Sequence, residues 1–168
     1  MIPILRTERL TLRPLRNADV PALVHHLAEW SVMRWLSAPP WPYTLKDAHW
    51  FVDQNNPDHW AIESNGKLAG VIALDPALGY WLAKDLHGNG LMSEAVESVL
   101  DHRFAASSDP VVSGHKLDNN ASRAVLLKHG FTDTHVEPLL SRPLGREVQV
   151  QRMELSANNW HSLRTAAQ

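Results

Sequence analysis

The chain of 168 residues contains no cysteine, which excludes disulfide bonds, thiolate metal ligands and a cysteine nucleophile. It also has no apolar run approaching the roughly 18 residues of a membrane-spanning helix. The charges of Arg6, Glu8, Arg9 and Arg13 interrupt the N-terminal segment, so we expect no signal peptide. The formal net charge of −2 provides no general attraction to nucleic acid or to an anionic membrane. These absences predict a cytoplasmic protein without nucleic-acid or membrane partners.

Residues that could bind a metal are present but scattered. The chain has 10 histidines, yet none belongs to an HExxH motif. His25 and His26 are adjacent, so on a helix their side chains point about 100° apart and chelate poorly. We therefore expect no metal site.

Length and composition suit a single domain, because 44% of the residues are hydrophobic and can fill one core. Apolar alternation predicts strands at about residues 10–14, 59–64, 67–75, 77–83, 111–117, 131–136 and 148–155. Helical spacing of apolar residues predicts helices at about residues 17–27, 44–55, 91–104 and 119–129. We expect a folded domain over residues 1–155 and a polar, loosely ordered tail over residues 156–168.

Short local signals predict where some of these elements begin and turn. Asn17 is a candidate helix cap, with Pro21 tolerated in the first turn. Thr44 and Asp47 have the spacing of a capping box at the start of the next helix. Asn65-Gly66 is the strongest hairpin signal in the chain, because this pair favours the turn that joins two antiparallel strands.

Two glycines stand where a strand passes into a helix, in the stretch HGNGLMSEAVESVLDHRF (residues 87–104). Glycine disfavours helix by about 1 kcal/mol relative to alanine, so local stability does not explain Gly88 and Gly90. The unpaired N–H groups at a helix N-terminus bind phosphate, and glycine lets a phosphate approach them without a side chain in the way. The alternative is a tight turn that merely needs positive φ, and a short glycine motif does not distinguish the two.

Two common phosphate-binding motifs do not fit this stretch. A P-loop needs Gly-Lys-Ser/Thr, but Leu91 and Met92 stand in that place. The dinucleotide fingerprint needs a third glycine where Ser93 stands, and an acidic residue about 20 positions further on, which Asp118 is too distant to be.

The order GYWL, HGNGLMSEA, SGHKLDNNASRAVLLKHGF resembles the GNAT superfamily of acyl-CoA-dependent N-acetyltransferases, and most of all its RimJ/RimL-like branch. The pyrophosphate-loop pattern of that family falls on His87, Gly90 and Met92. His87 departs from the usual Gln or Arg, and Met92 from the usual small residue. A second signature falls on Asn119, Ala121, Ser122, Lys128, Gly130 and Phe131. TERLTLRPL and PYT also resemble this branch, so the likeness extends over roughly residues 6–155.

The resemblance implies an α+β (mixed α/β) single-domain fold, with a mostly antiparallel central sheet, splayed strands and flanking helices. GYWL and VVSGHKL would be the splayed strands, and the pantetheine arm of acetyl-CoA would lie between them as an extra strand would. The pyrophosphate would sit on the amides of residues 88–93. The cofactor-binding residues expected from the resemblance are Trp81, Leu82, His87, Gly88, Asn89, Gly90, Leu91, Met92, Ser93, Asn119, Ser122 and Lys128.

The resemblance also suggests catalytic groups. Ser122 would lie near the sulfur and could protonate the CoA thiolate, although its hydroxyl could instead cap the helix. A backbone N–H near Trp81 or Leu82 could polarise the thioester carbonyl. His115 has a suitable unperturbed pKa for a general base, and Tyr80, Asp75 and Glu63 are alternatives to it, as is a water chain to a mobile carboxylate.

Aromatic residues before the cofactor half are candidates for the wall of the acceptor site, because aromatic rings suit an apolar portion or a cationic amine. These candidates are Trp35, Trp41 and Tyr43. For Trp50 we favour packing between helix and sheet.

Two functions remain open at this stage. The first is an N-acetyltransferase that acts on a primary amine of a small molecule or a protein N-terminus by direct attack in a ternary complex, with acetyl-CoA as donor and no metal. The amine could belong to a polyamine or an amino acid, and the enzyme would be a monomer or a homodimer. The alternative is a non-catalytic acyl-CoA-binding module. Both need Gly88 and Gly90, but only the enzyme needs proton-transfer groups and an open acceptor cleft.

Overall fold

The turn at Asn65 and Gly66 forms as predicted. Both residues have positive φ, 50° and 74°, and they join β3 (His59–Ser64) to β4 (Lys67–Leu74) in the computed structural model. The antiparallel register pairs Ser64 with Lys67 at the turn. The structure describes residues 1–167.

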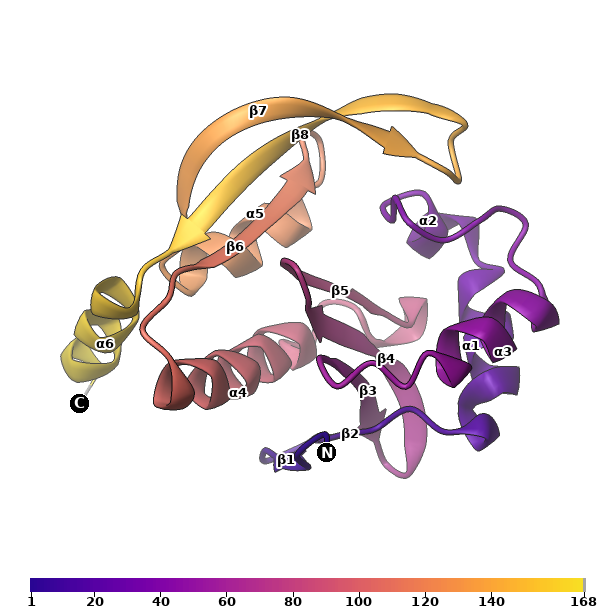
Figure 1. Cartoon of the computed structure of the whole chain (residues 1–168), viewed down its shortest axis with the longest axis horizontal. Helices are drawn as coiled ribbons and strands as arrows, with labels where there is room; N and C mark the ends of the chain where they lie inside the picture. The colour runs from indigo at the N-terminus through magenta and orange to yellow at the C-terminus, as the bar shows by residue number, and fades with distance from the viewer. Residues whose placement is uncertain (168) are drawn as a thin grey trace.

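The described residues form an eight-stranded sheet in the order β1-β2-β3-β4-β5-β6-β8-β7 (Figure 1). The remaining strands are β1 (Leu5–Arg6), β2 (Thr11–Arg13), β5 (Leu78–Leu82), β6 (Val111–Lys116), β7 (Thr132–Ser141) and β8 (Arg146–Leu155). The α-helices are α1 (Val20–Leu27), α2 (Trp30–Met33), α3 (Leu45–Asp53), α4 (Leu91–Ala106), α5 (Asn120–Lys128) and α6 (Ala157–Ala166). Short 3₁₀ turns lie at Asn17–Asp19 and Lys84–Leu86. The predicted α+β class with a mostly antiparallel sheet is confirmed.

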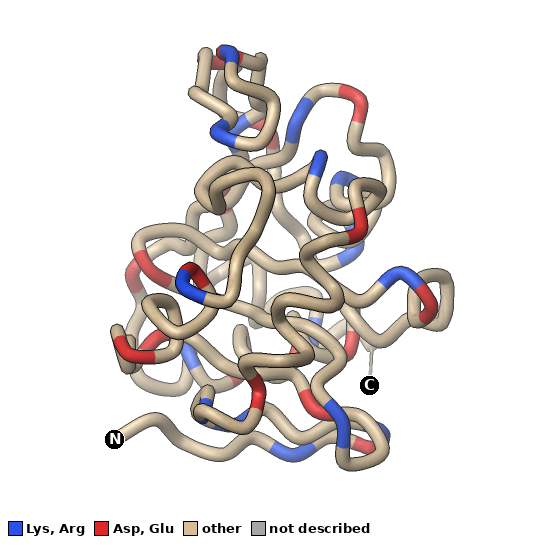
Figure 2. Tube along the Cα trace, turned by 90° about the vertical axis from the view of Figure 1, so that its right-hand side faces the viewer, with Lys and Arg blue, Asp and Glu red and all other residues tan. Residues whose placement is uncertain are grey.

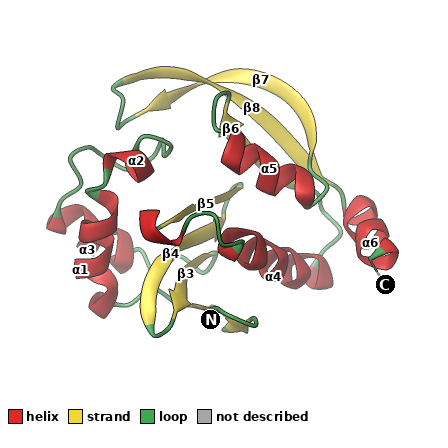
Figure 3. Cartoon of the chain, turned by 180° about the vertical axis from the view of Figure 1, so that it is seen from behind, coloured by secondary structure: helices red, strands yellow, loops and turns green. Residues whose placement is uncertain are grey.

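Alternation along the strands produces two hydrophobic cores, one on each face of the sheet. Trp60 and Ile62 of β3 pack with α4 and α6, whereas Ala61 between them packs with α1 and α3. Successive side chains of a strand point to opposite faces, which explains this division. Figure 3 shows α4 beside the β3–β5 part of the sheet and α5 beside β6. The β3–β5 part of the sheet is therefore covered on both faces.

Local capping determines where two helices begin. Thr44 accepts a hydrogen bond from the Asp47 amide while the Asp47 carboxylate accepts from the Thr44 amide, so the predicted capping box is present at α3. The prediction at Asn17 is wrong, because Asn17–Asp19 is a 3₁₀ turn and α1 begins at Val20. Pro21 does lie in the first turn of α1, where its missing N–H needs no partner.

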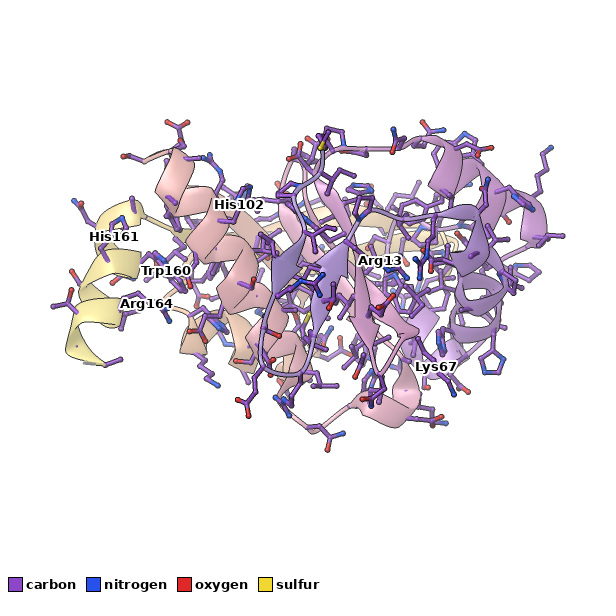
Figure 4. The ribbon with its side chains drawn as sticks, turned by 90° about the horizontal axis from the view of Figure 1, so that it is seen from below. Arg13, Lys67, His102, Trp160, His161 and Arg164 are labelled. Atoms are coloured by element: carbon purple, nitrogen blue, oxygen red, sulfur yellow. The ribbon has the colours of Figure 1, made fainter. Side chains whose placement is uncertain are left out.

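The C-terminal segment is helical rather than loosely ordered, so that expectation is wrong. Ser156 caps α6 by accepting a hydrogen bond from the Asn159 amide at 3.1 Å. Trp160 is buried and stacks on Phe104 of α4, with ring centroids 6.2 Å apart. Figure 4 shows Trp160, His161 and Arg164 of α6 beside α4, which carries His102. Gln168 lies outside the described residues.

Two further expectations differ from the structure. The strands β7 and β8 are longer than predicted, because the backbone pairing between them continues past Val136 and Val148 to the pair Ser141–Arg146. Trp50 does not pack between helix and sheet; it lies on the outer side of α3, with 64% of its surface exposed. In the part of the chain that is described, no helix is both long enough and apolar enough to cross a bilayer. Figure 2 shows charges of both signs interspersed along the trace.

Candidate active site

The sheet opens between β5 and β6. These two strands are parallel, and Leu78 and Ser113 are paired in register at one end of the opening. The Ser113 hydroxyl donates to the Leu78 carbonyl at 2.8 Å and closes this end. Beyond this pair the strands diverge, as Figure 1 shows. The predicted splay of the two strands is thereby confirmed.

A cavity of about 540 Å³ lies in this opening. Its lining combines both splayed strands, the glycine loop and the first turns of α4 and α5. Of the residues predicted to bind the cofactor or to catalyse, those that line it are Tyr80, Trp81, Leu82, His87, Gly88, Gly90, Leu91, Met92, Ser93, His115, Asn119 and Ser122. The fold thus brings together residues that are far apart in the sequence.

The edge of β5 offers backbone groups to the cavity. The Ala83 amide donates to the Ala69 carbonyl at 2.7 Å. Because every second residue of an antiparallel strand bonds to the same neighbour, the backbone N–H and C=O groups of Trp81 also point toward β4. The amides of Tyr80 and Leu82 consequently point toward the opening. The Leu82 carbonyl is occupied, because it lies 2.7 Å from Nε2 of His87. His87 therefore fixes the end of β5 against the glycine loop.

The glycine loop presents a row of free amides at the N-terminus of α4. Gly88 and Gly90 have φ of 79° and 74°, which side chains with a Cβ rarely adopt. The first helical bond runs from the Glu94 amide to the Gly90 carbonyl. No partner in the described chain accepts from the amides of residues 88–93. Free amides at the N-terminus of a 16-residue helix are typical of a site that binds an anion.

A network from the N-terminal segment supports this loop, and sequence reasoning missed it. Arg9 donates through Nε to Glu94 at 2.7 Å and through Nη1 to the Asn89 carbonyl at 2.8 Å. Thr7 and the Arg9 amide also donate to the Glu94 carboxylate. Burial raises the pKa of Glu94, but these hydrogen bonds outweigh it and leave the pKa lowered. Because Arg9 and Glu94 are 85 residues apart, no local pattern signals the contact.

Tyr80 and Ser122 meet across the cavity. The phenol oxygen lies 3.0 Å from the Ser122 hydroxyl. Burial raises the pKa of Tyr80 to about 12, although the hydrogen bond with Ser122 acts in the opposite direction. The phenol therefore stays protonated at neutral pH. The cap of α5 is Asn119, whose side chain accepts from the Ser122 amide at 3.2 Å, so the Ser122 hydroxyl is not the cap.

His115 lines the cavity, but both of its ring nitrogens are engaged. Nδ1 lies 2.8 Å from the Lys116 carbonyl, which only accepts, so we assign the proton to Nδ1. Nε2 is then the acceptor for Nη1 of Arg123 at 3.3 Å, and Arg123 is held by Asp133. The lone pair that a general base would use is therefore occupied by the Arg123 guanidinium. The base role of His115 stays a prediction that this geometry does not favour.

Several predicted residues lie away from the cavity. Lys128 is exposed at the C-terminal end of α5, and the Asn89 side chain folds back onto the carbonyls of Leu86 and His87. Tyr43 is buried in the core between α1 and α3, which raises its pKa to about 12. Trp41 packs against Trp30 instead, with ring centroids 4.9 Å apart and the rings tilted by 56°.

Two of the suggested bases, Glu63 and Asp75, are also outside the cavity lining. Glu63 pairs with Arg13 at 2.6 Å, and Asp75 accepts from Asn56. Trp35 is the predicted acceptor-side aromatic residue that does line the cavity. No group of three potential metal ligands lies together within residues 1–167.

The buried Lys116 connects β6 to the segment after α2 and to the end of β7. The Lys116 ammonium donates to the carbonyls of Arg34 and Leu36, at 2.7 and 3.0 Å, and to the Ser141 hydroxyl at 3.1 Å. Its pKa is lowered, chiefly by burial. Through these bonds β6 holds the segment after α2 against the end of β7. The sequence does not reveal this contact, because its partners are more than 20 residues away along the chain.

Comparison with known proteins follows from this geometry. Residues 9–132 match the family model described as acetyltransferase (GNAT) domain. A sequence comparison with curated proteins finds no match.

Solved structures share the fold over nearly the whole chain. RimL, a ribosomal L7/L12 alpha-N-protein acetyltransferase in complex with coenzyme A, has a TM-score of 0.78 at 23% identity, with 92% of this chain and 98% of that chain covered. The acetyltransferase from Salmonella typhimurium that modifies the N-terminal serine of L7/L12 has a TM-score of 0.74 at 23% identity, covering 92% and 99%. The microcin C7 self-immunity acetyltransferase MccE, with acetyl-CoA and AMP, has 0.77 at 19% identity, covering 89% and 93%.

Proposed function

The chain belongs to the GNAT acetyltransferase domain family, and from this membership we propose that it transfers the acetyl group of acetyl-CoA to a primary amine by direct attack in a ternary complex. The observation that carries the proposal is the meeting of two features: the opening between β5 and β6, and the free amides of residues 88–93 at its end. An extended arm that ends in a diphosphate fits this combination.

The residues present fit acetyl-CoA. The row of N–H groups from Gly88 to Ser93 suits the pyrophosphate, and the support from Arg9 and Glu94 keeps that row in place. The amides of Tyr80 and Leu82 suit the amide groups of the pantetheine arm, because an extended chain can pair with a free strand edge. Solved neighbours of this chain bind coenzyme A or acetyl-CoA.

We assign proton donation to Ser122 and Tyr80. Acetyl-CoA supplies an acetyl group already activated as a thioester; the amine forms the new C–N bond, the C–S bond breaks, and the sulfur gains a proton. The Ser122 hydroxyl can deliver that proton and regain one from Tyr80 through the 3.0 Å contact. The phenol then recovers its proton from solvent, to which the amine has released one. A backbone N–H at the end of β5 is suited to stabilise the developing negative charge on the carbonyl oxygen.

The acceptor amine needs no dedicated metal or histidine in this scheme. It attacks in its neutral form and releases its proton to water in the cavity. His115 then has a positioning role, since it joins β6 to α5 through Arg123. Trp35 remains the aromatic wall that we assign to the acceptor side.

The experiment that tests the proposal measures free thiol released from acetyl-CoA in the presence of a panel of amines. The panel includes polyamines, amino acids and peptides with free N-termini. We expect thiol release with at least one amine class, and acetylated product by mass spectrometry. Binding of CoA without turnover of any amine would instead support the non-catalytic acyl-CoA-binding module.

A further inference from the structure

A second cavity of about 230 Å³ adjoins the acetyl-CoA cavity. Trp35 and Lys116 line both cavities, so the two cavities adjoin at these residues. The second cavity is formed by the end of α2, the end of β6 and the start of β8, including Arg34, Asp118 and Arg146. It lies on the acceptor side of the site.

This second cavity has an excess of positive charge. Arg34, Lys116 and Arg146 contribute three cations, and Asp118 is the one carboxylate in the lining. Both arginines face Lys116 closely enough to lower its pKa together with burial, whereas Asp118 acts in the opposite direction. The cavity therefore attracts anions although the whole chain has a net charge of −2.

The hydrogen-bond donors that remain available belong to the arginines. Lys116 already donates to three oxygens, and its ammonium has no further N–H to offer. Within residues 1–167, neither Arg34 nor Arg146 forms an ion pair with a carboxylate. The contact that Arg146 makes is a long one, 3.4 Å from Nη1 to the Glu147 carbonyl. The two guanidinium groups are thus free to bind an anion.

The guanidinium of Arg34 is exposed and lies over the ring of the neighbouring Trp35. Its central carbon lies 4.5 Å from the centre of the Trp35 ring. The backbone carbonyl of the same residue is bound by Lys116, which fixes the turn that carries the side chain. A planar guanidinium with little freedom loses less entropy on binding a carboxylate or phosphate, and it can donate two parallel hydrogen bonds.

We propose that Arg34 and Arg146 form an anion-binding subsite for the acceptor, so that the preferred substrate is a primary amine that also carries a carboxylate or phosphate group. The inference rests on the proposed acetyl transfer. The second cavity holds the anionic group, and Trp35 lies between that group and the reacting amine. Lys116 contributes charge and positions Arg34.

The test compares acids with matched neutral amides as acceptors. The probes are ω-amino acids of increasing chain length, from β-alanine to 6-aminohexanoate, their carboxamides, and the corresponding aminoalkylphosphonates. We expect kcat/KM for the best acid to exceed that for its carboxamide by about tenfold or more, the difference typical of a charge-assisted hydrogen bond. The phosphonates distinguish a carboxylate site from a phosphate site.

The double variant Arg34→Gln/Arg146→Gln should lose this preference and still acetylate the carboxamides. Comparing the acid-to-amide ratio between variants cancels differences in amine basicity. Arg6→Gln/Lys67→Gln is the matched control, because it removes two exposed positive charges that lie outside both cavities. We expect the control to retain the wild-type ratio.

The outcomes separate this inference from the proposed function. Turnover of acids and amides at equal kcat/KM by the wild type would overturn the anion subsite and leave acetyl transfer intact. A preference for acids that persists in the double variant would also overturn the assignment to these arginines. Turnover of no amine, despite bound CoA, would overturn the acetyl transfer itself and the subsite with it.

Discussion

The Ser122 hydroxyl is the side-chain group on which the proposed proton transfer depends most directly. Its partner is the phenol of Tyr80, while the capping of α5 belongs to Asn119. Ser122→Ala should therefore lower turnover by about 10²-fold or more, the low end for a positioned acid or base. Affinity for CoA should stay close to that of the wild type, because the loss arises in the transition state. Turnover and CoA affinity measured on one preparation test this.

Ser156→Ala is the matched control, since Ser156 is a true helix cap at α6. It should cost about 1 kcal/mol of unfolding free energy and leave turnover unchanged. A Ser122→Ala protein that behaves in the same way, less stable but fully active, would contradict the catalytic assignment.

Tyr80 should make stability depend on pH in the alkaline range. Its pKa is about 12 in the folded protein and 10.0 as the ordinary value, so the unfolded chain loses the proton first. The contribution of the neutral phenol is fully present below pH 10 and is lost as the pH rises toward 12, with a slope of at most about 1.4 kcal/mol per pH unit. Urea unfolding at several pH values above 9 gives the unfolding free energy as a function of pH. This free energy should fall less steeply with pH in Tyr80→Phe than in the wild type. Equal slopes would contradict the prediction.

Residues whose partners are close in sequence were predictable, and residues whose partners are distant were not. Thr44 and Asp47 cap the helix in which Asp47 lies, so a local motif was enough to identify them. Arg9 and Lys116 each bind groups more than 20 residues away, and their own sequence neighbourhoods contain nothing unusual. Trp41 was predicted at the cavity as an aromatic wall, but its ring packs against Trp30 outside the cavity lining.

The N-terminus of α4 depends on a backbone conformation that only glycine adopts easily. Gly90 and Gly66 both have φ of 74°, and no heavy atom lies within 4 Å of a Cβ placed on Gly66. Valine at either position should cost about 1–2 kcal/mol of stability because of this positive φ. Gly90→Val should also weaken CoA binding by about tenfold or more. The valine relieves its strain by rotating the loop amides away from the ligand, and a loss of about 1.4 kcal/mol in binding free energy is a factor of about ten in Kd.

Isothermal titration of CoA into both variants distinguishes the effects. Gly66→Val should bind CoA as the wild type does, because its hairpin is outside the cavity lining. Equal CoA affinity in the two valine variants would mean that the glycines of the loop serve the turn alone.

The helix α6 should contribute strongly to stability, although its sequence is mostly polar. Trp160 is 3% exposed, and a Cβ on Gly130 would lie 2.4 Å from Leu163, which shows how closely α6 approaches the end of α5. Trp160→Ala should lower the unfolding free energy by about 3–5 kcal/mol. Trp50→Ala, at a tryptophan with 64% exposure, should change it by much less. Denaturant unfolding of the pair measures this, and equal effects would contradict the packing role of α6.

Elements with a strong apolar period were predictable, and elements that gain their apolar partners from elsewhere were not. The period of α4 is visible in the sequence because its buried residues recur along one face. The helix α6 packs through one large buried side chain, Trp160, which contacts Phe104 of α4, while Gly130 leaves room for the close approach of α6. The second half of β7, Glu137–Ser141, pairs with β8 through backbone bonds, but Pro138, Leu139 and Leu140 follow one another without the polar–apolar alternation of a strand.

Ligand binding should stabilise the molecule as a whole. Acetyl-CoA or CoA should raise the melting temperature in proportion to the logarithm of its concentration, because it binds the native state alone. NAD and ATP at matched concentrations should do so much less, since the opening between β5 and β6 suits the pantetheine arm that they lack. Differential scanning fluorimetry measures the shift. An equal shift with all three ligands would contradict the assignment of the opening to acetyl-CoA.

The sheet order could not be obtained from the residues alone, but the resemblance predicted its main feature. Hairpin turns identify neighbours such as β3 and β4, whereas nothing local places β6 beside β5 or β8 between β6 and β7. The resemblance supplied the splayed pair, and the register of Leu78 with Ser113 locates where the splay begins. No pattern in the sequence predicted the second cavity, because residues that follow α2 line it together with residues at the end of β6 and the start of β8.

The opening in the sheet also has a consequence for the protein without a bound ligand. An interrupted sheet has two more unpaired strand edges than a continuous one, and here they lie in the interior of the strand order rather than at its ends. Unpaired edges are templates on which other chains can add strands. If the arm of acetyl-CoA pairs with these edges as proposed, it makes them unavailable to the strands of other chains.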